Sequence, residues 1–511
     1  MTQKYILAHD LGTTGNKATI YDPEGNLLAS SYDEYPTHYF GLNCVEQDPM
    51  DWWKAVCSST RSVIAAAGIS PDTIACVTFS GHMMGCLPVD KDATPLRPSI
   101  IWADSRSVDQ ANHLVEQVGM EEGYRITGHC LLPMYSAAKI MWVRDNEPDV
   151  FKKTHKVLHV KDFIAAKLTG TFATDLSDAS GMNLYDLKRR GWSEPLLKAS
   201  QIPVEMLPEP HPSSDIIGEV TKPAAQETGL RPGTPVVIGG GDGPCAAVGS
   251  GVVSEGSAYN YFGSAAWIGI ASKQPAYDPQ MRTFTFFHLD PDLFMPVGAS
   301  NNGGYSYQCF RDAVWSAQHA IADQLDVNLF DLMGLAAANA PVGCDKLLYL
   351  PYIRGERCPY NNPNARGVFL GLTPNHRKEH LTRAVMEGVV LNQRIILDAL
   401  ESQGAHVEEM CVIGGGAKSA LWRQIMADVY NKRILKPRLL QEATSLGAAI
   451  AGGVGVGLFK DFQAAEAMVQ IVDTQEPDPA AHQRYGALYT VFQSAYAALV
   501  PVFEEMAALE A

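Results

Sequence analysis

A single carboxylate, that of Asp242, lies in the glycine-rich segment of residues 239–244. The apolar residues 235–238 before it are typical of a strand, and the small apolar residues 245–248 after it suit the start of a helix. Glycines at such a turn let a substrate approach the backbone closely. A carboxylate in that position can accept the proton of a bound hydroxyl group. The segment therefore predicts a general base on a turn between a strand and a helix.

A second candidate site is the turn of residues 11–15, which is flanked by charged side chains. Its backbone amides, together with the hydroxyls of Thr13 and Thr14, could bind phosphate oxygens. Lys17 adds a positive charge, and Asp10 could hold Mg²⁺ through water. Taken alone, the turn is explained equally well as an ordinary hairpin with a surface lysine, because short glycine motifs often occur by chance.

Two further glycine turns occur in the second half of the chain. Gly263 and Ser264 lie between two apolar runs, and the glycine triplet 414–416 lies between a strand-like run and a helical one. The triplet leaves room for a flat ring or a phosphate at a helix N-terminus. Each of these turns alone could be a tight turn without a special function. The four turns together predict a site for phosphoryl transfer.

The segment around Asp242 also fits a loose dinucleotide-binding fingerprint, with Gly241, Gly243 and Ala246 at the required spacing. Two observations argue against that interpretation. An aspartate inside the turn would face the negatively charged pyrophosphate, and the acidic residue expected about 20 positions later is missing. We therefore reject a dinucleotide site.

The composition is that of an acidic globular protein. The 511 residues carry a formal net charge of −16, and 46% of them are hydrophobic, which suits roughly two to four domains. A surface of this charge repels phosphate backbones and anionic lipids, so we expect no nucleic-acid and no membrane partner. The 10 cysteines show no spacing typical of zinc. Without a signal-peptide pattern, we expect a cytoplasmic protein.

The elements that must position these turns recur along the chain. Residues 5–10 and 16–21 are predicted to form two strands around the first turn. Residues 256–262 and 267–271 repeat this pattern around Gly263. A hairpin that returns after half the chain indicates two structurally duplicated halves.

The boundary between the halves is expected near residues 249–254, between the glycine-rich turn that contains Asp242 and the second hairpin. Helices are predicted after the acidic cap Asp51, over residues 391–400, and over residues 488–500. Pro501 should end or kink the last of these. Alternating strands and helices of this kind favour α/β lobes with mixed sheets.

Longer stretches of the chain resemble the FGGY carbohydrate kinases of the actin-like ATPase superfamily. Residues 134–146 resemble the first signature of that family, and residues 367–372 with 380–387 resemble the second. Residues 350–357 and 442–449 are similar to xylulose-kinase-like members. The similarity covers nearly the whole chain.

This resemblance implies an α/β fold of two duplicated actin-like (ribonuclease H-like) lobes with an active cleft between them. Residues 1–249 would form the N-terminal lobe, with the sugar site and the catalytic base. Residues 250–511 would form the C-terminal lobe, with the nucleotide site. The implied activity is phosphorylation of a sugar, and the implied cofactors are ATP and Mg²⁺.

The resemblance also implies roles for individual residues. Asp242 would be the catalytic base, and Asp10 would help to place Mg²⁺. Sugar contacts are expected from His82, Met83, Met84, Trp102, Asp104 and Trp267. The two tryptophans could equally be aromatic residues of the core. Nucleotide contacts are expected from Thr13, Thr14, Lys17, Gly263, Ser264, Gly304, Gln308, Gly415, Gly416 and Ser419.

The sugar loop departs from the pattern of xylulose kinases. These usually have Gln-Met-His where this chain has His82-Met83-Met84, and Asp-Asn where it has Asp242-Gly243. We expect the chemistry to survive, with a small-molecule sugar as partner. A pentulose, first of all D-xylulose, is the expected substrate, and another ketose, a polyol or a sugar acid is the alternative. A non-catalytic actin-like sensor of sugar or ATP is the alternative from another class, and the residues leave open whether the chain forms a homodimer.

Overall fold

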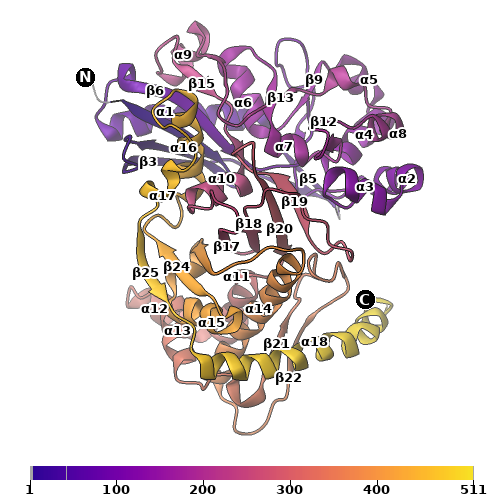
Figure 1. The fold of residues 1–511 in the computed structure, drawn as a ribbon, viewed down its shortest axis with the longest axis vertical. Helices are drawn as coiled ribbons and strands as arrows, with labels where there is room; N and C mark the ends of the chain where they lie inside the picture. The colour runs from indigo at the N-terminus through magenta and orange to yellow at the C-terminus, as the bar shows by residue number, and fades with distance from the viewer. Residues whose placement is uncertain (1–3, 42, 510–511) are drawn as a thin grey trace.

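The computed structural model describes residues 4–41 and 43–509 and consists of two lobes, each built around a seven-stranded mixed sheet (Figure 1). The first sheet contains, in spatial order, β14 (Ile216–Glu219), β15 (Pro235–Val237), β6 (Ile74–Gly81), β1 (Tyr5–Leu11), β2 (Gly15–Tyr21) and β3 (Leu27–Glu34), with β16 (Gly240–Gly241) beside β6. The second contains β19 (Phe284–Phe287), β20 (Phe294–Ser300), β18 (Ala266–Ile270), β17 (Ala258–Phe262), β23 (Glu409–Ile413), β24 (Arg433–Pro437) and β25 (Ile471–Gln475).

The two sheets share one topology. β1, β2 and β3 form an antiparallel meander, and β6 and β15 continue the sheet in parallel on the other side of β1. β17, β18 and β20 form the same meander, with β23 and β24 in parallel beside β17. This repetition confirms the predicted α/β fold with two duplicated lobes.

Helices cover both faces of the first sheet. α1 (Pro49–Ala67), α6 (Val160–Thr169) and α9 (Lys222–Thr228) pack on one face, and α10 (Asp242–Gly249) and α16 (Ala443–Gly455) pack on the other. α1 begins before the predicted cap Asp51, because Asp48 caps it by accepting a hydrogen bond from the backbone of Met50.

The second sheet is covered on one face by α11 (Gly304–Val314), α14 (Lys378–Glu401) and α15 (Ala420–Tyr430), while α10 touches the other face; α18 (Pro479–Ala507) packs on α15 and on β21 (Leu348–Pro351). The other helices described are α2 (Val108–Val118), α3 (Met120–Thr127), α4 (Ser136–Asn146), α5 (Pro148–Lys153), α7 (Leu176–Ser180), α8 (Glu194–Ser200), α12 (Ser316–Gln324), α13 (Leu329–Ala338) and α17 (Ala464–Met468). Short strands outside the two sheets are β4 (His38–Phe40), β5 (Cys44–Gln47), β7 (Leu87–Val89), β8 (Ser99–Ile100), β9 (Lys156–Leu158), β10 (Ala173–Asp175), β11 (Tyr185–Asp186), β12 (Gly191–Trp192), β13 (Glu209–His211), β21 (Leu348–Pro351) and β22 (Gly367–Leu370).

The segment of α16 and α17, although late in the sequence, packs on the first sheet (Figure 1, yellow helices beside the indigo strands). α16 crosses α10 so closely that a Cβ on Gly447 would overlap the carbonyl oxygen of Cys245, and one on Gly249 would overlap that of Ala443. Only glycine permits this approach of the two helix backbones. α10, which begins with Asp242, also contacts β17 and β18 and so lies between the two sheets.

The helix predicted over residues 488–500 is longer at both ends. α18 runs through Pro501, so the proline does not end the helix. Pro501 is exposed, and the buried side chains of Tyr496 and Phe503 on either side of it anchor the helix to the second lobe. Among the described residues, α18 is the one helix long and apolar enough to cross a membrane. Here it packs on the core of the second lobe.

Candidate active site

Strand ends converge at the edge of the first sheet where Asp242 lies. In register, Gly240 of β16 pairs with Ser80 of β6, and Ser80 pairs with Asp10 of β1. The residues that follow these positions therefore meet at one edge: the loop that starts at His82, and the start of α10. The predicted base, the predicted metal ligand and the predicted sugar loop are thus brought together.

Asp242 is half-buried at the first position of α10. Burial raises the pKa of its carboxyl to about 7, and the negative charge of Asp10 contributes further. The backbone N–H of Gly243 donates to its Oδ1 at 2.8 Å. A carboxyl group with this pKa can both take up and release a proton near neutral pH.

Asp10 and Lys17 face each other across the first hairpin. Burial raises the pKa of Asp10, although a hydrogen bond from Ser80 and the charge of Lys17 oppose the shift. The Lys17 ammonium donates to the carbonyl of Gln441 at 3.0 Å and lies 3.6 Å from the Glu442 carboxylate. Through Lys17, the first hairpin therefore contacts the segment that leads into α16.

The hydroxyls of the first turn have protein partners. The Trp102 indole N–H donates to Thr13 Oγ1 at 2.9 Å, and Gln47 Nε2 donates to the carbonyl of Thr13 at 2.6 Å. The Thr14 hydroxyl lies 2.9 Å from that of Tyr32. Trp102 is thus tied to the turn of residues 11–15, with its side chain partly exposed.

The three residues of the sugar loop have different surroundings. His82 is buried with both ring nitrogens unpartnered, and burial lowers the pKa of its imidazole to about 3, so the ring is neutral. Met83 packs in the core against Gly241 and Phe286. Met84 has a positive φ of 63° and is only partly buried. His82 therefore carries the unsatisfied polar groups of the loop.

Lys139 organises this loop, and the sequence analysis gave it no role. Its ammonium is fully buried and donates to the carbonyls of Met84 and Ile101 at 2.8 and 2.7 Å. Burial lowers its pKa to about 7. The lysine lies inside the segment 134–146 that carries the family resemblance, which was the available signal. It joins the loop of Met84 to the loop of Trp102.

Asp104 is also near Trp102, but its carboxylate already has partners. It is fully buried, its Oδ2 accepts from the backbone N–H of Val45 at 2.6 Å, and both of its oxygens accept from Arg106. A sugar contact by Asp104 stays a prediction. Its contacts in this structure stabilise the loop around Trp102.

The second lobe reaches Asp242 through two aromatic residues. The Trp267 indole N–H donates to the Tyr259 hydroxyl at 2.8 Å, and that hydroxyl donates to the carbonyl of Gly243 at 2.8 Å. Trp267 also stacks on Tyr261, with ring centroids 3.9 Å apart. The sequence analysis missed Tyr259, which lies inside the expected strand 256–262. Trp267 is thus linked through Tyr259 to Gly243, the residue after the predicted base.

The remaining glycine turns lie together at the carboxyl ends of β17 and β23. The N–H of Gly304 donates to the carbonyl of Gly263 at 2.7 Å, and the N–H of Tyr305 donates to that of Ser264 at 3.0 Å. Gln308 lies one turn further along α11 and is partly buried. These contacts bring the second turn and the start of α11 into one group.

The glycine triplet follows β23 and forms a short 3₁₀ helix, Gly415–Lys418. Gly416 packs against the ring of Phe262, whereas a Cβ on Gly415 would meet nothing within 4 Å. Ser419 caps α15, with its Oγ accepting from the backbone N–H of Trp422 at 3.3 Å. The open side of Gly415 leaves room for a ligand beside the cap.

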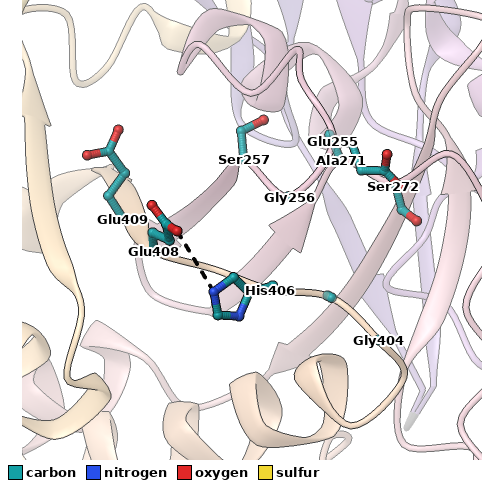
Figure 2. Close-up of a pocket in the computed structure, with 10 residues that line it drawn as sticks. Glu255, Gly256, Ser257, Ala271, Ser272, Gly404, His406, Glu408 and Glu409 are labelled. Carbon is teal, nitrogen blue, oxygen red and sulfur yellow. Dashed lines mark ion pairs between the residues drawn. The ribbon is translucent and has the colours of Figure 1, made fainter.

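A surface pocket of about 540 Å³ lies at the opposite end of the second sheet (Figure 2). It is lined by residues that precede β17 and β23 and follow β18, among them Ser257, Ser272 and His406. His406 pairs with Glu408 at its rim at 3.9 Å. Since the glycine turns lie at the other ends of these strands, this pocket is separate from the candidate active site.

Comparison with known proteins connects this geometry to a family. The FGGY family of carbohydrate kinases matches with its N-terminal domain over residues 5–249 and with its C-terminal domain over residues 258–456. The xylulose kinase of Bacillus subtilis (strain 168) is 29% identical over 494 residues, which cover 96% of this chain and 97% of that protein. The gluconokinase of the same strain is 30% identical over 490 residues, covering 96% and 94%. The crystal structure of ligand-bound xylulose kinase from Lactobacillus acidophilus superimposes with a TM-score of 0.91 at 27% identity, covering 98% of this chain and all of that one. The chain therefore belongs to the FGGY family of carbohydrate kinases and is a sugar kinase with the actin-like ATPase fold.

Proposed function

We propose that the protein transfers the γ-phosphoryl group of ATP to a primary hydroxyl of a pentulose, with D-xylulose as the first candidate. The observation that carries this proposal is Asp242. Its carboxyl has a pKa of about 7 and lies where β1, β6 and β16 end. The next residue, Gly243, accepts a hydrogen bond from Tyr259 of the second lobe.

The proposed reaction needs one base. Asp242 accepts the proton of the sugar hydroxyl as that oxygen forms a bond to the γ-phosphorus. The bond between this phosphorus and the β–γ bridging oxygen breaks, and ADP leaves in line with the incoming oxygen. The products are the phosphorylated sugar, ADP and the proton held on Asp242.

The residues around Asp242 fit a magnesium ion. Asp10 and Asp242 are two half-buried carboxylates whose pKa values are both raised, and Asp10 contributes to the shift of Asp242. Carboxylate oxygens in such a setting are ligands that Mg²⁺ prefers. Asp10 would hold the ion, which would supply charge neutralisation at the phosphates when bound.

The glycine turns suit the nucleotide. Gly12 and Gly415 have little or nothing against the side where a Cβ would stand, so a phosphate or a ring can approach the backbone there. Gly263 and Gly304 are hydrogen-bonded to each other next to the end of β17. We assign the phosphates to the turns of residues 11–15 and 263–265, and the adenosine to the turn of residues 414–419.

D-Gluconate is the second candidate substrate, and the similarity to gluconokinase favours it. That relative is as similar to this chain as the xylulose kinase is. The loop chemistry also differs from the xylulose-kinase pattern at Met84 and Gly243. His82, neutral and with both ring nitrogens unpartnered, could hydrogen-bond the hydroxyls of either sugar.

A screen of sugar-dependent ADP release tests the proposal. Pentuloses, hexuloses, polyols and sugar acids are compared by kcat/KM, and mass spectrometry identifies the phosphorylated product. Asp242→Asn is the control: it should lower turnover by about 10²–10⁴-fold and leave ATP binding by calorimetry nearly unchanged. Higher kcat/KM for D-gluconate than for every pentulose would replace the first candidate by the second, and normal turnover by Asp242→Asn would remove Asp242 from the role of base.

A further inference from the structure

A fully buried group of charges lies beneath the loops that carry Asp242 and His82. The Lys161 ammonium contacts the carboxylates of Asp162, Asp175 and Asp178 at 2.6, 2.9 and 3.0 Å, and none of these side chains is exposed to solvent. Burial disfavours the charge of Lys161, but the three carboxylates overcome this and raise its pKa well above the usual value. Charges buried this deeply are costly unless each one has a partner.

Asp175 connects this group to the active-site backbone. Its Oδ1 faces Lys161, while its Oδ2 accepts hydrogen bonds from the hydroxyls of Ser177 and Ser213 at 2.6 and 2.9 Å. Both serines are buried. Hydrogen bonds to a carboxylate are stronger than those between neutral groups, so the two hydroxyls have fixed directions.

Ser177 in turn holds the residue before the base. A serine hydroxyl has one proton, and here that proton is committed to Asp175. The Ser177 oxygen is therefore left as an acceptor, and the backbone N–H of Gly241 donates to it at 2.9 Å. Gly241 is the N-cap residue of α10, and Asp242 follows it.

The segment that ends at Asp242 has little freedom elsewhere. The N–H of Gly239 donates to the carbonyl of Ser213 at 3.0 Å. Gly239 has a φ of +67°, and a Cβ there would overlap the carbonyl of Phe79. Gly240 and Gly241 pair with β6 in the sheet, and the hydrogen bond from Gly241 to Ser177 adds a side-chain contact directly before the base.

We propose that Ser177, oriented by the Lys161–Asp175 pair, is a positioning residue that fixes the carboxylate of Asp242 for proton transfer. The inference rests on the proposed role of Asp242 as the base. Ser177 acts through Gly241 and touches neither sugar nor nucleotide in this scheme. Displacement of a reacting group by about 1 Å can cost on the order of 100-fold in rate, so the loss of this hydrogen bond should be visible in turnover.

The chain offers a matched pair of variants for the test. Ser177→Ala and Ser213→Ala each remove one buried hydroxyl that donates to Asp175 Oδ2, but only Ser177 also accepts from Gly241. Turnover is measured with D-xylulose or D-gluconate, whichever is the better substrate. Ser177→Ala should lower kcat by about 10–100-fold with the KM for MgATP unchanged, and Ser213→Ala should keep kcat within about threefold of the wild type. The melting temperature should change by a similar amount in Ser177→Ala and Ser213→Ala.

The pH dependence and a double variant separate positioning from other effects. The pH at which kcat is half-maximal should stay the same in Ser177→Ala, because the hydrogen bond is made to Gly241 rather than to the Asp242 carboxylate. In an Asp242→Asn background, Ser177→Ala should have no further effect, since residues that act as a unit are not additive. If Ser177→Ala does not fold, Ser177→Cys, whose sulfur is a weak acceptor, should show the same selective loss of kcat.

Equal kcat values for the two alanine variants, or additive losses in the double variant, would overturn this proposal and leave the base assignment intact. An Asp242→Asn enzyme with normal turnover would instead overturn the base assignment, and the positioning role with it. The two failures are therefore distinguishable.

Discussion

At the scale of single residues, the proposed base of this kinase is one carboxyl group whose pKa is set by its neighbours. Asp242 is half-buried and lies near the charge of Asp10, and the carbonyl of the next residue, Gly243, accepts a hydrogen bond from Tyr259 of the second lobe. A base is most effective when its pKa lies near the working pH. The pKa of about 7 therefore suits proton removal from a sugar alcohol in neutral solution.

The pH dependence of turnover follows from this value. Only the ionised carboxylate of Asp242 can take the proton, so kcat/KM for the sugar, which reports the free enzyme, should fall as the pH drops below about 7 and reach a plateau above it. A pH series of kcat/KM for the sugar measures this. A rate that falls to half only at about pH 4, the ordinary pKa of Asp, would contradict the raised pKa.

Substrate preference should respond to two residues of the proposed sugar site, Met84 and Gly243. A Cβ on Gly243 would be 3.5 Å from Met295 and 3.9 Å from the Tyr259 hydroxyl, so a larger side chain has room there. Met84 has a positive φ, which histidine tolerates better than most residues. Met84→His with Gly243→Asn adds two hydrogen-bonding groups and should raise the ratio of kcat/KM for D-xylulose over D-gluconate by about tenfold.

Met84→Leu is the control for that experiment, because it changes the side chain without adding a polar group. The ratio for Met84→Leu should stay close to that of the wild type. A wild-type protein that already prefers D-xylulose strongly over all other sugars would show that these two positions do not limit its specificity.

At the scale of elements, the crossing of α10 and α16 depends on glycine. Gly447→Ala would improve the helix propensity of α16 by up to about 1 kcal/mol, but its Cβ would overlap the backbone of Cys245. Overpacking of this kind costs about 1–3 kcal/mol, so the variant should be destabilised in chemical unfolding. Gly486→Ala in α18, where a Cβ meets nothing within 4 Å, should be neutral or stabilising. Equal stability of both variants would show that the helices can separate at little cost.

The elements that the sequence predicted well are those with local signals. The two hairpins and the glycine turns were identified because alternating apolar residues and turn residues lie next to each other in the chain. Ser177 and Asp175 were missed because each has a decisive partner far away in the sequence: Gly241 is 64 positions from Ser177, and Ser213 is 38 positions from Asp175. Nothing in the sequence distinguishes a buried lysine such as Lys161 from the many solvated ones. The continuation of α18 through Pro501 likewise depends on tertiary packing of its apolar face.

At the scale of the whole molecule, the loop proposed to bind sugar belongs to the first lobe, and the turns near Gly263 and Gly415, proposed to bind the nucleotide, belong to the second. A ligand pair that contacts both should therefore draw the lobes together. Small-angle scattering with sugar and a non-hydrolysable ATP analogue should show a smaller radius of gyration than with either ligand alone. An unchanged radius at saturation of both sites would speak against closure.

The placement of α16 on the first sheet also constrains the order in which the chain can fold during synthesis. The apolar face formed by Ile6, Ala8 and Cys76 is covered by Leu446 and Ile450, which are translated roughly 200 residues after Gly249. At about 5–20 residues per second, that delay is on the order of 10–40 s. During this interval the apolar face of the nascent first lobe is not covered by α16 and is exposed to solvent. We therefore expect the first lobe to complete its packing only after α16 has emerged.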